Sequence, residues 1–234
     1  MANQTLFHVT HAKAGSTWLY NVFVSAFGSR RVAKRVGGKT ENYHYEPGKI
    51  YPAMFLSFQD FSALEGSDSG PCFFVVRDIR DTLVSLYFSM RYSHTDKGFP
   101  HIAKFRQEVE GMSDPEGIAH TFRTRSAAFM RVQESWLDSG KPVLKYEELL
   151  SDAEGLLTGY FDSVGFSYDR AALKKAIDEN SFEKKFGRAL GQKDIKSHGR
   201  QGAPGDWKNY ADPAVEAVIE ERFGSLLAKC GYGR

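Results

Sequence analysis

Short apolar runs alternate along the chain with segments whose apolar residues recur at helical intervals. Thr5 to Thr10 is a run with β-branched and aromatic members, and helical spacing follows from Ser16 to Phe27. Further apolar runs lie at 53–58, 72–76 and 142–146. Continuous apolar runs, rather than alternating ones, are typical of parallel strands that helices cover on both faces. The pattern therefore predicts an α/β fold with a central, mostly parallel sheet.

The remaining helices are predicted from the same periodicity, with Gly and Pro marking their ends. They are expected at 79–90, 116–139, 147–164, 169–186 and from 213 to 224 or beyond. Polar stretches with Gly and Pro at 29–51, 93–114 and 187–206 predict loops, the second with a short helix. We expect a single three-layer α/β/α domain over residues 1–234.

Composition narrows the classes of protein and of partner. The chain has 234 residues and 41% hydrophobic content, enough for one sizeable core. Lys plus Arg (31) nearly balances Asp plus Glu (29), so the charge balance gives no sign of nucleic-acid binding. Neither a signal segment nor an apolar stretch near twenty residues occurs. Cys72 and Cys230 lack metal-ligand spacing, and we expect a cytoplasmic protein without a membrane span or a metal.

The stretch HAKAGSTWL, residues 11–19, joins the first predicted strand to the first predicted helix. A helix N-terminus at the carboxyl end of a parallel strand offers backbone N–H groups and a positive dipole end to an anion. Gly15 lets the backbone wrap closely round the anion, Ser16 and Thr17 add hydroxyl donors, and Lys13 adds a full charge. The stretch therefore predicts a P-loop-like phosphate site. The structural alternative is an ordinary turn with Ser16 as N-cap and Lys13 in solvent.

At these residues the chain resembles the sulfotransferases that use 3′-phosphoadenosine 5′-phosphosulfate (PAPS). Their phosphosulfate loop has the pattern K-[SA]-G-[TS]-T-W-[LI], which KAGSTWL matches at every position. The resemblance implies that Lys13 contacts the phosphosulfate bridge and stabilises the leaving group. It further implies that Ala14 belongs to the cofactor loop, that Gly15, Ser16 and Thr17 bind the 5′-phosphate, and that Trp18 stacks on adenine.

A second motif of the same family follows the run 72–76. RDIRDTLVS resembles the family's 3′-phosphate element, R-[ND]-P-[KR]-D-x-x-V-S, and implies that Arg77 and Ser85 hold the 3′-phosphate. Ile79 replaces the frequent proline. The structural alternative is a surface ion pair between Arg77 and Asp81.

The third match is RQGAPGDWKNY, residues 200–210, which is similar to the family pattern R-K-G-x-x-G-D-W-K-N. It implies cofactor contacts from Arg200, Gln201 and Gly202, with Gln201 in place of the usual lysine. Its structural alternative is a mobile surface loop. Lesser matches are Tyr146 and Phe182, where the family has residues lining the adenine, although either could belong to the core.

The family's catalytic histidine is absent from its usual place, where Ser57 and Phe58 stand. The substitutes for a general base are His44, Glu41 and Glu46 in the segment TENYHYEPGK, and His11, two residues before Lys13. The segment 41–46 is favoured because some distant sulfotransferases use a glutamate from an equivalent early segment.

The expected activity is transfer of the sulfuryl group from PAPS to a hydroxyl or amine of a small-molecule or glycan acceptor, with PAP (3′-phosphoadenosine 5′-phosphate) as product. Two alternatives stay open. A P-loop kinase or NTPase is disfavoured because GxxxxGK[ST] needs Gly followed at once by Lys. A non-catalytic nucleotide-binding module would account for the missing histidine. The acceptor's identity and the oligomeric state are left open.

Overall fold

The computed structural model describes residues 4–233 except Lys39, Asp96 and His198, and the chain divides into two compact units. Unit 1 comprises residues 1–77 and 131–181, and unit 2 comprises residues 78–130 and 182–234. The expectation of one domain over residues 1–234 stays a prediction.

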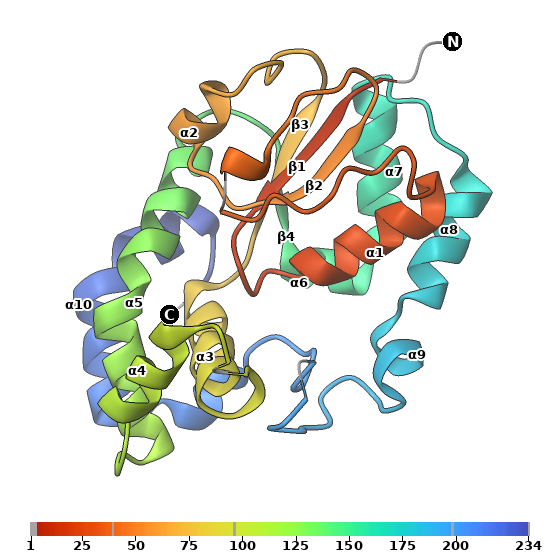
Figure 1. The fold of residues 1–234 in the computed structure, drawn as a ribbon. Coiled ribbons are helices and arrows are strands. Elements are labelled where there is room, and N and C mark those ends of the chain that lie inside the picture. Colours follow the sequence, from red (N-terminus) through yellow and green to blue (C-terminus); the bar gives the residue numbers. More distant parts are fainter. Residues whose placement is uncertain (1–3, 39, 96, 198, 234) are drawn as a thin grey trace. The chain divides into compact units, whose positions relative to one another are not determined.

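Unit 1 is built on a parallel sheet of four strands (Figure 1). The strands lie in the order β2–β1–β3–β4, and they are β1 (Leu6–Thr10), β2 (Ile50–Met54), β3 (Cys72–Val76) and β4 (Val143–Lys145). β1 is central and pairs with β3 from Phe7↔Cys72 to Thr10↔Val75. The prediction of a mostly parallel sheet is confirmed.

The second strand begins three residues and ends four residues earlier than its apolar run at 53–58 predicted. Pro52 interrupts the pattern but is accommodated because β2 is the outermost of the four strands, where a missing N–H group costs least. The segment 32–37 runs beside β2, through bridges of Val32 to Ile50 and Gly37 to Met54. After Met54 the chain turns into α2 (Phe58–Ser62), which Ser57 caps by accepting a hydrogen bond from the Asp60 amide.

Helices cover both faces of the sheet in unit 1. On one face, α1 (Ser16–Phe27), α6 (Tyr146–Ser151), α7 (Ala153–Ser163) and α8 (Arg170–Glu179) bury a core against Leu6, Phe73 and Val75. On the other face, α2 and residues 131–137 of α5 (Asp114–Leu137) pack aromatic rings on the strands. Phe74 stacks on Trp136 at 5.4 Å between ring centroids, and Phe7 meets Phe61 edge to face at 5.3 Å. Unit 1 thus has the predicted three layers.

Unit 2 is mainly helical. Its elements are α3 (Ile79–Phe88), the π-helical turn η2 (Ser89–Ser93), α4 (Pro100–Glu108), the first part of α5, α9 (Phe182–Phe186), η3 (Asp206–Tyr210) and α10 (Pro213–Cys230). Phe122 of α5 packs on Phe223 of α10, with ring centroids 5.4 Å apart. The predicted helices are confirmed, with the segments 147–164 and 169–186 each divided into two helices.

The carboxylate of Asp81 fastens the segment that carries the third motif. Its oxygens accept hydrogen bonds from the backbone amides of Gly205 (2.6 Å) and Trp207 (3.0 Å) within unit 2. Arg80 lies over the Trp207 ring at 4.0 Å and pairs with Asp78 at 2.7 Å. Because Asp81 is buried and its carboxylate holds two backbone amides, the G-D-W-K-N stretch is anchored within unit 2.

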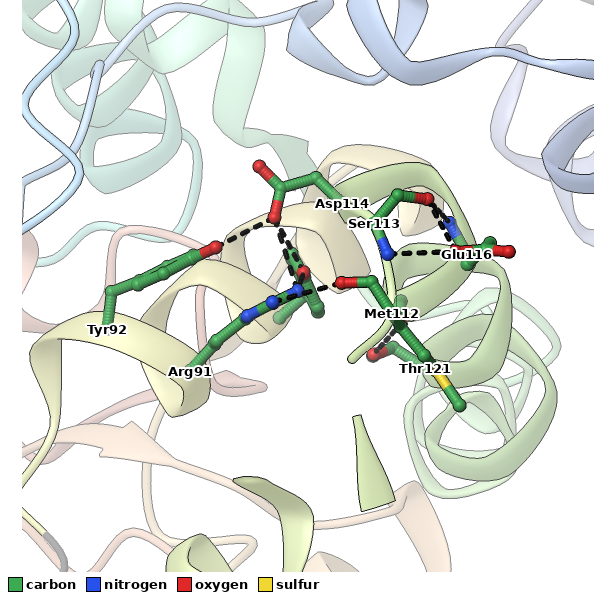
Figure 2. Close-up of polar contacts among 9 residues, drawn as sticks. Arg91, Tyr92, Met112, Ser113, Asp114, Glu116 and Thr121 are labelled. Carbon is green, nitrogen blue, oxygen red and sulfur yellow. Dashed lines mark hydrogen bonds and ion pairs between the residues drawn. The ribbon is translucent and has the colours of Figure 1, made fainter. Parts of the chain in front are cut away.

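A second polar cluster of unit 2 joins η2 to the start of α5 (Figure 2). Asp114 accepts hydrogen bonds from the hydroxyls of Tyr87 (2.7 Å) and Tyr92 (2.8 Å), and Arg91 lies 3.4 Å from the same oxygen. Burial and the hydrogen bond to Asp114 raise the pKa of Tyr87, so it remains a neutral donor. The polar groups of the cluster bind one another, and these contacts stabilise the turn after α3.

Of the helices within the described part of the chain, none combines the length and apolar character needed to cross a bilayer.

Candidate active site

The loop between β1 and α1 has the backbone geometry of an anion cradle. Lys13 and Gly15 both lie in the left-handed region, with φ of 72° and 73°. Gly15 is the N-cap of α1 and makes no side-chain cap, so the first amides of the helix point toward the position that an anion would take. Ser16 begins the helix and does not cap it, which contradicts the simple capped turn.

Gly15 is required by a close neighbour as well as by its φ. A Cβ atom added at Gly15 would lie 2.5 Å from Cε2 of Tyr146, the first residue of α6. The guanidinium of Arg77 lies over the same Tyr146 ring at 4.8 Å. Tyr146 is buried, and its ring packs against the loop at Gly15. Its predicted place beside the adenine stays a prediction.

Arg77 joins the end of β3 to the loop. Its Nη1 donates a hydrogen bond to the carbonyl oxygen of Lys13 at 2.7 Å. This contact holds the strained backbone at Lys13 and brings the residue expected at the 3′-phosphate next to the residue expected at the phosphosulfate. Two motifs that are 64 residues apart in sequence therefore meet within unit 1.

His11 is buried at the entrance of the loop, with both ring nitrogens hydrogen-bonded. Nδ1 donates to the carbonyl oxygen of Ala12 (2.9 Å), and Nε2 accepts from Nε2 of Gln133 (2.8 Å). The same Gln133 nitrogen donates to the carbonyl oxygen of Arg77 at 3.0 Å. Burial is the main cause that lowers the pKa of His11 to about 4. This geometry favours the role of a neutral residue that positions the loop. The role of general base, which the sequence left open for His11, is less favoured.

His8, which lies on β1 three residues before His11, is also buried and neutral. Its Nδ1 accepts a hydrogen bond from the Ala53 amide at 3.2 Å, and its ring stacks on Phe73. Burial, with a smaller contribution from the charge of Arg35, lowers the pKa of His8 to about 3.

Arg35 is a residue of the loop region that no sequence motif indicated. Its Nη1 donates to Oγ1 of Thr17 at 3.0 Å and its Nη2 to Oγ of Ser16 at 3.4 Å. Gln133 was missed for the same reason, because neither residue belongs to a local pattern. The one available signal for Arg35 was the cluster of basic residues in 30–35 directly after α1.

The other candidate bases lie on exposed positions of the segment before β2. Tyr51 donates from its hydroxyl to the carbonyl oxygens of His44 (3.1 Å) and Glu46 (3.2 Å), and the Gly48 amide donates to Oγ1 of Thr5. These contacts place 44–48 at the amino ends of β1 and β2. The loop of residues 11–17 follows the carboxyl end of β1, and a five-residue strand spans about 16 Å. The structure therefore does not bring His44 or Glu46 to Lys13.

Glu41 differs from them because it lies between that segment and Gly37. Gly37 pairs with Met54 at the carboxyl end of β2, on the same edge of the sheet as the loop. Glu41 is exposed in the short helical turn η1 (Thr40–Asn42). Among the favoured residues 41–46, Glu41 is the one whose neighbourhood stays compatible with a role at the loop.

The residues expected at the cofactor in unit 2 have the following surroundings. Ser85 is half-buried in the second turn of α3. Arg200 lies over the ring of Phe88 at 4.4 Å and pairs with Asp206. Gly202 has φ of 73°, and an added Cβ would lie 2.6 Å from the Phe182 ring. Gln201 carries a buried Oε1 atom that has no hydrogen-bond partner among the described residues.

Asp206 is the acceptor that organises these cations. Burial by itself would raise the pKa of Asp206, but the hydrogen bond from Lys193 and the charge of Arg200 lower it on balance. Arg200 is therefore held in place by a carboxylate before any ligand binds.

Burial limits how two further residues of the loop region can contact a nucleotide. Ala14 is fully buried, so that only its backbone could face a nucleotide. Trp18 is partly buried and packs against the core of unit 1, with its ring edge about 3.5 Å from the Cβ position of Gly15. Stacking of Trp18 on adenine stays a prediction.

A cavity of about 640 Å³ in unit 1 lies away from the loop. It is lined by residues such as Phe61, Cys72 and Lys141, which surround the amino end of β3. Phe58 and Phe61 line this cavity and also pack against Trp136 of the core. The cavity that they line lies at the end of the sheet opposite to the loop.

The fold and the loop define the class of protein: an α/β protein with a candidate anion-binding loop at the carboxyl end of a parallel strand. Residues 73–231, more than half of the chain, match the family model of the sulfotransferase domain, so the chain belongs to this family. The expected family and enzyme class, a PAPS-dependent sulfotransferase, are confirmed. The match begins after the β1–α1 loop, which was identified independently of it.

Solved structures share the fold over nearly the whole chain. Mouse sulfotransferase SULT7A1 complexed with PAP is 16% identical, with a TM-score of 0.69, over 100% of this chain and 91% of that chain. Retinol dehydratase in complex with androsterone and the inactive cofactor PAP is 15% identical, with a TM-score of 0.57, over 96% and 82%. Its complex with retinol and PAP gives a TM-score of 0.51. A search of curated proteins found no match.

Proposed function

We propose that this sulfotransferase takes the sulfuryl group from PAPS and transfers it to a hydroxyl or amine of a small-molecule or glycan acceptor. The observation that carries the proposal is the β1–α1 loop, in which Lys13 and the open N-terminus of α1 lie beside Arg77. The PAP in the similar structures supports PAPS as the donor. Androsterone and retinol in retinol dehydratase favour a small apolar alcohol within the range of acceptors.

The backbone of the β1–α1 loop supports the assignment of the donor to this loop. The backbone is left-handed at Lys13 and Gly15, and Tyr146 packs where a Cβ of residue 15 would lie. The loop therefore leads directly into the N-terminal amides of α1, which are donors for an anion. We assign the 5′-phosphate to the backbone and hydroxyl groups of Gly15, Ser16 and Thr17. Contacts to the 3′-phosphate are assigned, as the family resemblance implies, to Arg77, Ser85, Arg200 and the backbone of 201–202. Adenine contacts are assigned to Trp18, Tyr146 and Phe182.

PAPS, when bound, supplies an activated sulfuryl group whose leaving group is a phosphate anion. Lys13 keeps a positive charge at the loop, which lowers the energy of the negative charge that develops on the leaving oxygen. The amides of Ser16 and Thr17 orient the phosphate so that the acceptor can approach in line. Glu41 is proposed as the base that takes the acceptor's proton, and neutral His11 holds the loop in position through Gln133 and Ala12.

The first experiment is calorimetric titration of the chain with PAP, 5′-AMP and ATP·Mg²⁺. Preference for PAP over 5′-AMP in the absence of metal supports the proposal. Preference for ATP·Mg²⁺ would instead indicate a kinase or NTPase. If PAP binds, release of PAP from PAPS is measured with a panel of alcohols, phenols and amines. Binding without turnover on the whole panel would favour a non-catalytic module.

Three expectations from the sequence stay predictions: location in the cytoplasm, independence of metal and absence of nucleic-acid binding. The sequence leaves the oligomeric state open.

A further inference from the structure

Arg35 reaches the phosphate loop from a segment that is separate from both family motifs of unit 1. Val32 pairs with Ile50 at the start of β2, and Gly37 pairs with Met54 at its end. Arg35 therefore lies near the carboxyl end of the sheet, where the loop also lies. There its guanidinium donates to the hydroxyls of Thr17 and Ser16, at 3.0 and 3.4 Å.

The charge of Arg35 has no carboxylate partner within the part of the chain that the structure describes. Its described contacts are the two hydroxyls, which are neutral, and the ring of Tyr20 at 5.8 Å. A guanidinium has five N–H groups, so several donors remain beyond these two bonds. Arg35 is exposed, but the neighbouring groups exclude part of the water around its guanidinium, and this desolvation lowers its pKa from the usual value. A cation in this state favours an incoming anion.

We propose that Arg35 is a second cation of the phosphate loop and binds the 5′-phosphosulfate end of the donor. The inference rests on the proposed function, which assigns the 5′-phosphate to Ser16 and Thr17. An anion that accepts hydrogen bonds from the same two hydroxyls lies within reach of the guanidinium that already contacts them. Arginine is suited to this position because its planar fork meets two oxygens of a phosphate or sulfate at once.

Two cations on opposite sides of the loop divide the work. Lys13 lies on the backbone that Arg77 holds, whereas Arg35 approaches from the segment beside β2. The positive charge of Arg35 stays next to the leaving phosphate during transfer and adds to that of Lys13. Since the loop residues and Arg35 all belong to unit 1, the arrangement is complete within that unit.

The test compares R35A, R35K and the neighbouring control K34A, since Lys34 is exposed and lies outside the proposed site. Each is titrated with PAP, which has a 5′-phosphate, and with 3′-AMP, which lacks one. R35A is expected to weaken PAP binding by about tenfold to hundredfold and to leave 3′-AMP binding unchanged. R35K keeps the charge without the fork and recovers part of the affinity. K34A should behave as the parent chain does.

Turnover of PAPS supplies a second readout, in which R35A lowers kcat as well as raising KM. Equal losses for PAP and 3′-AMP in R35A would mean that Arg35 only supports the fold, and this overturns the inference. So would a K34A effect as large as that of R35A, which would indicate unspecific attraction. If R35A does not fold, R35K decides by the same comparison of PAP with 3′-AMP. A parent chain that fails to prefer PAP over 5′-AMP would overturn the proposed function itself, and the Arg35 assignment with it.

Discussion

Arg77 donates a hydrogen bond from Nη1 to the carbonyl oxygen of Lys13, with 2.7 Å between the two atoms. The bond connects the end of β3 to the left-handed backbone of the phosphate loop. A residue expected to bind the 3′-phosphate therefore also positions the residue expected to act on the leaving group. Changes at Arg77 should consequently affect both nucleotide binding and turnover.

The substitutions Lys13→Ala and Arg77→Ala distinguish the role of Lys13 in turnover from the role of Arg77 in nucleotide binding. Lys13→Ala is expected to lower kcat by about a hundredfold or more, while PAP binding partly survives, because the lost charge acts mainly on the leaving oxygen. Arg77→Ala should weaken PAP binding by about tenfold to hundredfold, with a smaller loss of kcat through the freed Lys13 carbonyl. Steady-state kinetics with PAPS and calorimetry with PAP measure the two effects. Unchanged kinetics in both variants would refute the site assignment.

Gly15→Ala tests whether the loop needs glycine for space as well as for its φ. Alanine at Gly15 would suffer the left-handed strain and would also press on the Tyr146 ring, 2.5 Å from the new Cβ. Gly140→Ala is the matched control, since its φ is 70° and no atom lies within 4 Å of its Cβ position. We expect about 1 kcal/mol of destabilisation in the control and about 1–3 kcal/mol more at Gly15. Urea unfolding measures the difference, and equal losses would contradict the role of Tyr146.

Folding stability should fall in mild acid because of two buried histidines. Burial lowers the pKa of His8 to about 3 and that of His11 to about 4, from 6.5 in the unfolded chain. Below pH 6.5 the unfolded state therefore takes up protons that the folded state refuses, and the free energy of unfolding decreases as the pH falls. At pH 5 the loss is about 2 kcal/mol for each histidine. Urea unfolding at pH 7.5 and pH 5 measures it.

The control for this pH dependence is His101→Gln, because His101 is exposed. It should keep the slope of stability against pH, whereas His11→Gln should reduce the slope. A chain whose stability is the same at both pH values would show that these histidines are protonated in the folded state.

Glu41→Gln and Glu46→Gln separate the two candidate carboxylates. Glu46 pairs with Lys49 at 3.5 Å on the segment that enters the amino end of β2, so its loss should leave turnover unchanged. Glu41→Gln is expected to lower kcat by about a hundredfold, because a general base commonly contributes that much, and to leave PAP binding unaltered. Kinetics with a hydroxyl acceptor would settle the matter, and full activity of Glu41→Gln would exclude this base.

Local sequence patterns determined much of this molecule. The spacing of apolar residues predicted β1, α1, β3 and the helix after it, because each element depends on neighbours within a few residues. KAGSTWL indicated the loop and, with two later motifs, the sulfotransferase family. The bounds of β2 were predicted less well, since Pro52 interrupts its apolar run and the pairing with β1 shifts register between Tyr51 and Met54.

Only the tertiary structure decided which residues meet at the loop. The contact of His11 with Gln133 joins positions 122 residues apart, and Arg35 reaches Ser16 and Thr17 only because the segment 32–37 runs beside β2. Strand order and direction likewise set 44–48 at the amino ends of the strands, away from Lys13. Such contacts depend on pairing and packing between distant segments, whereas hydrophobic periodicity reports only which face of its own element a residue occupies.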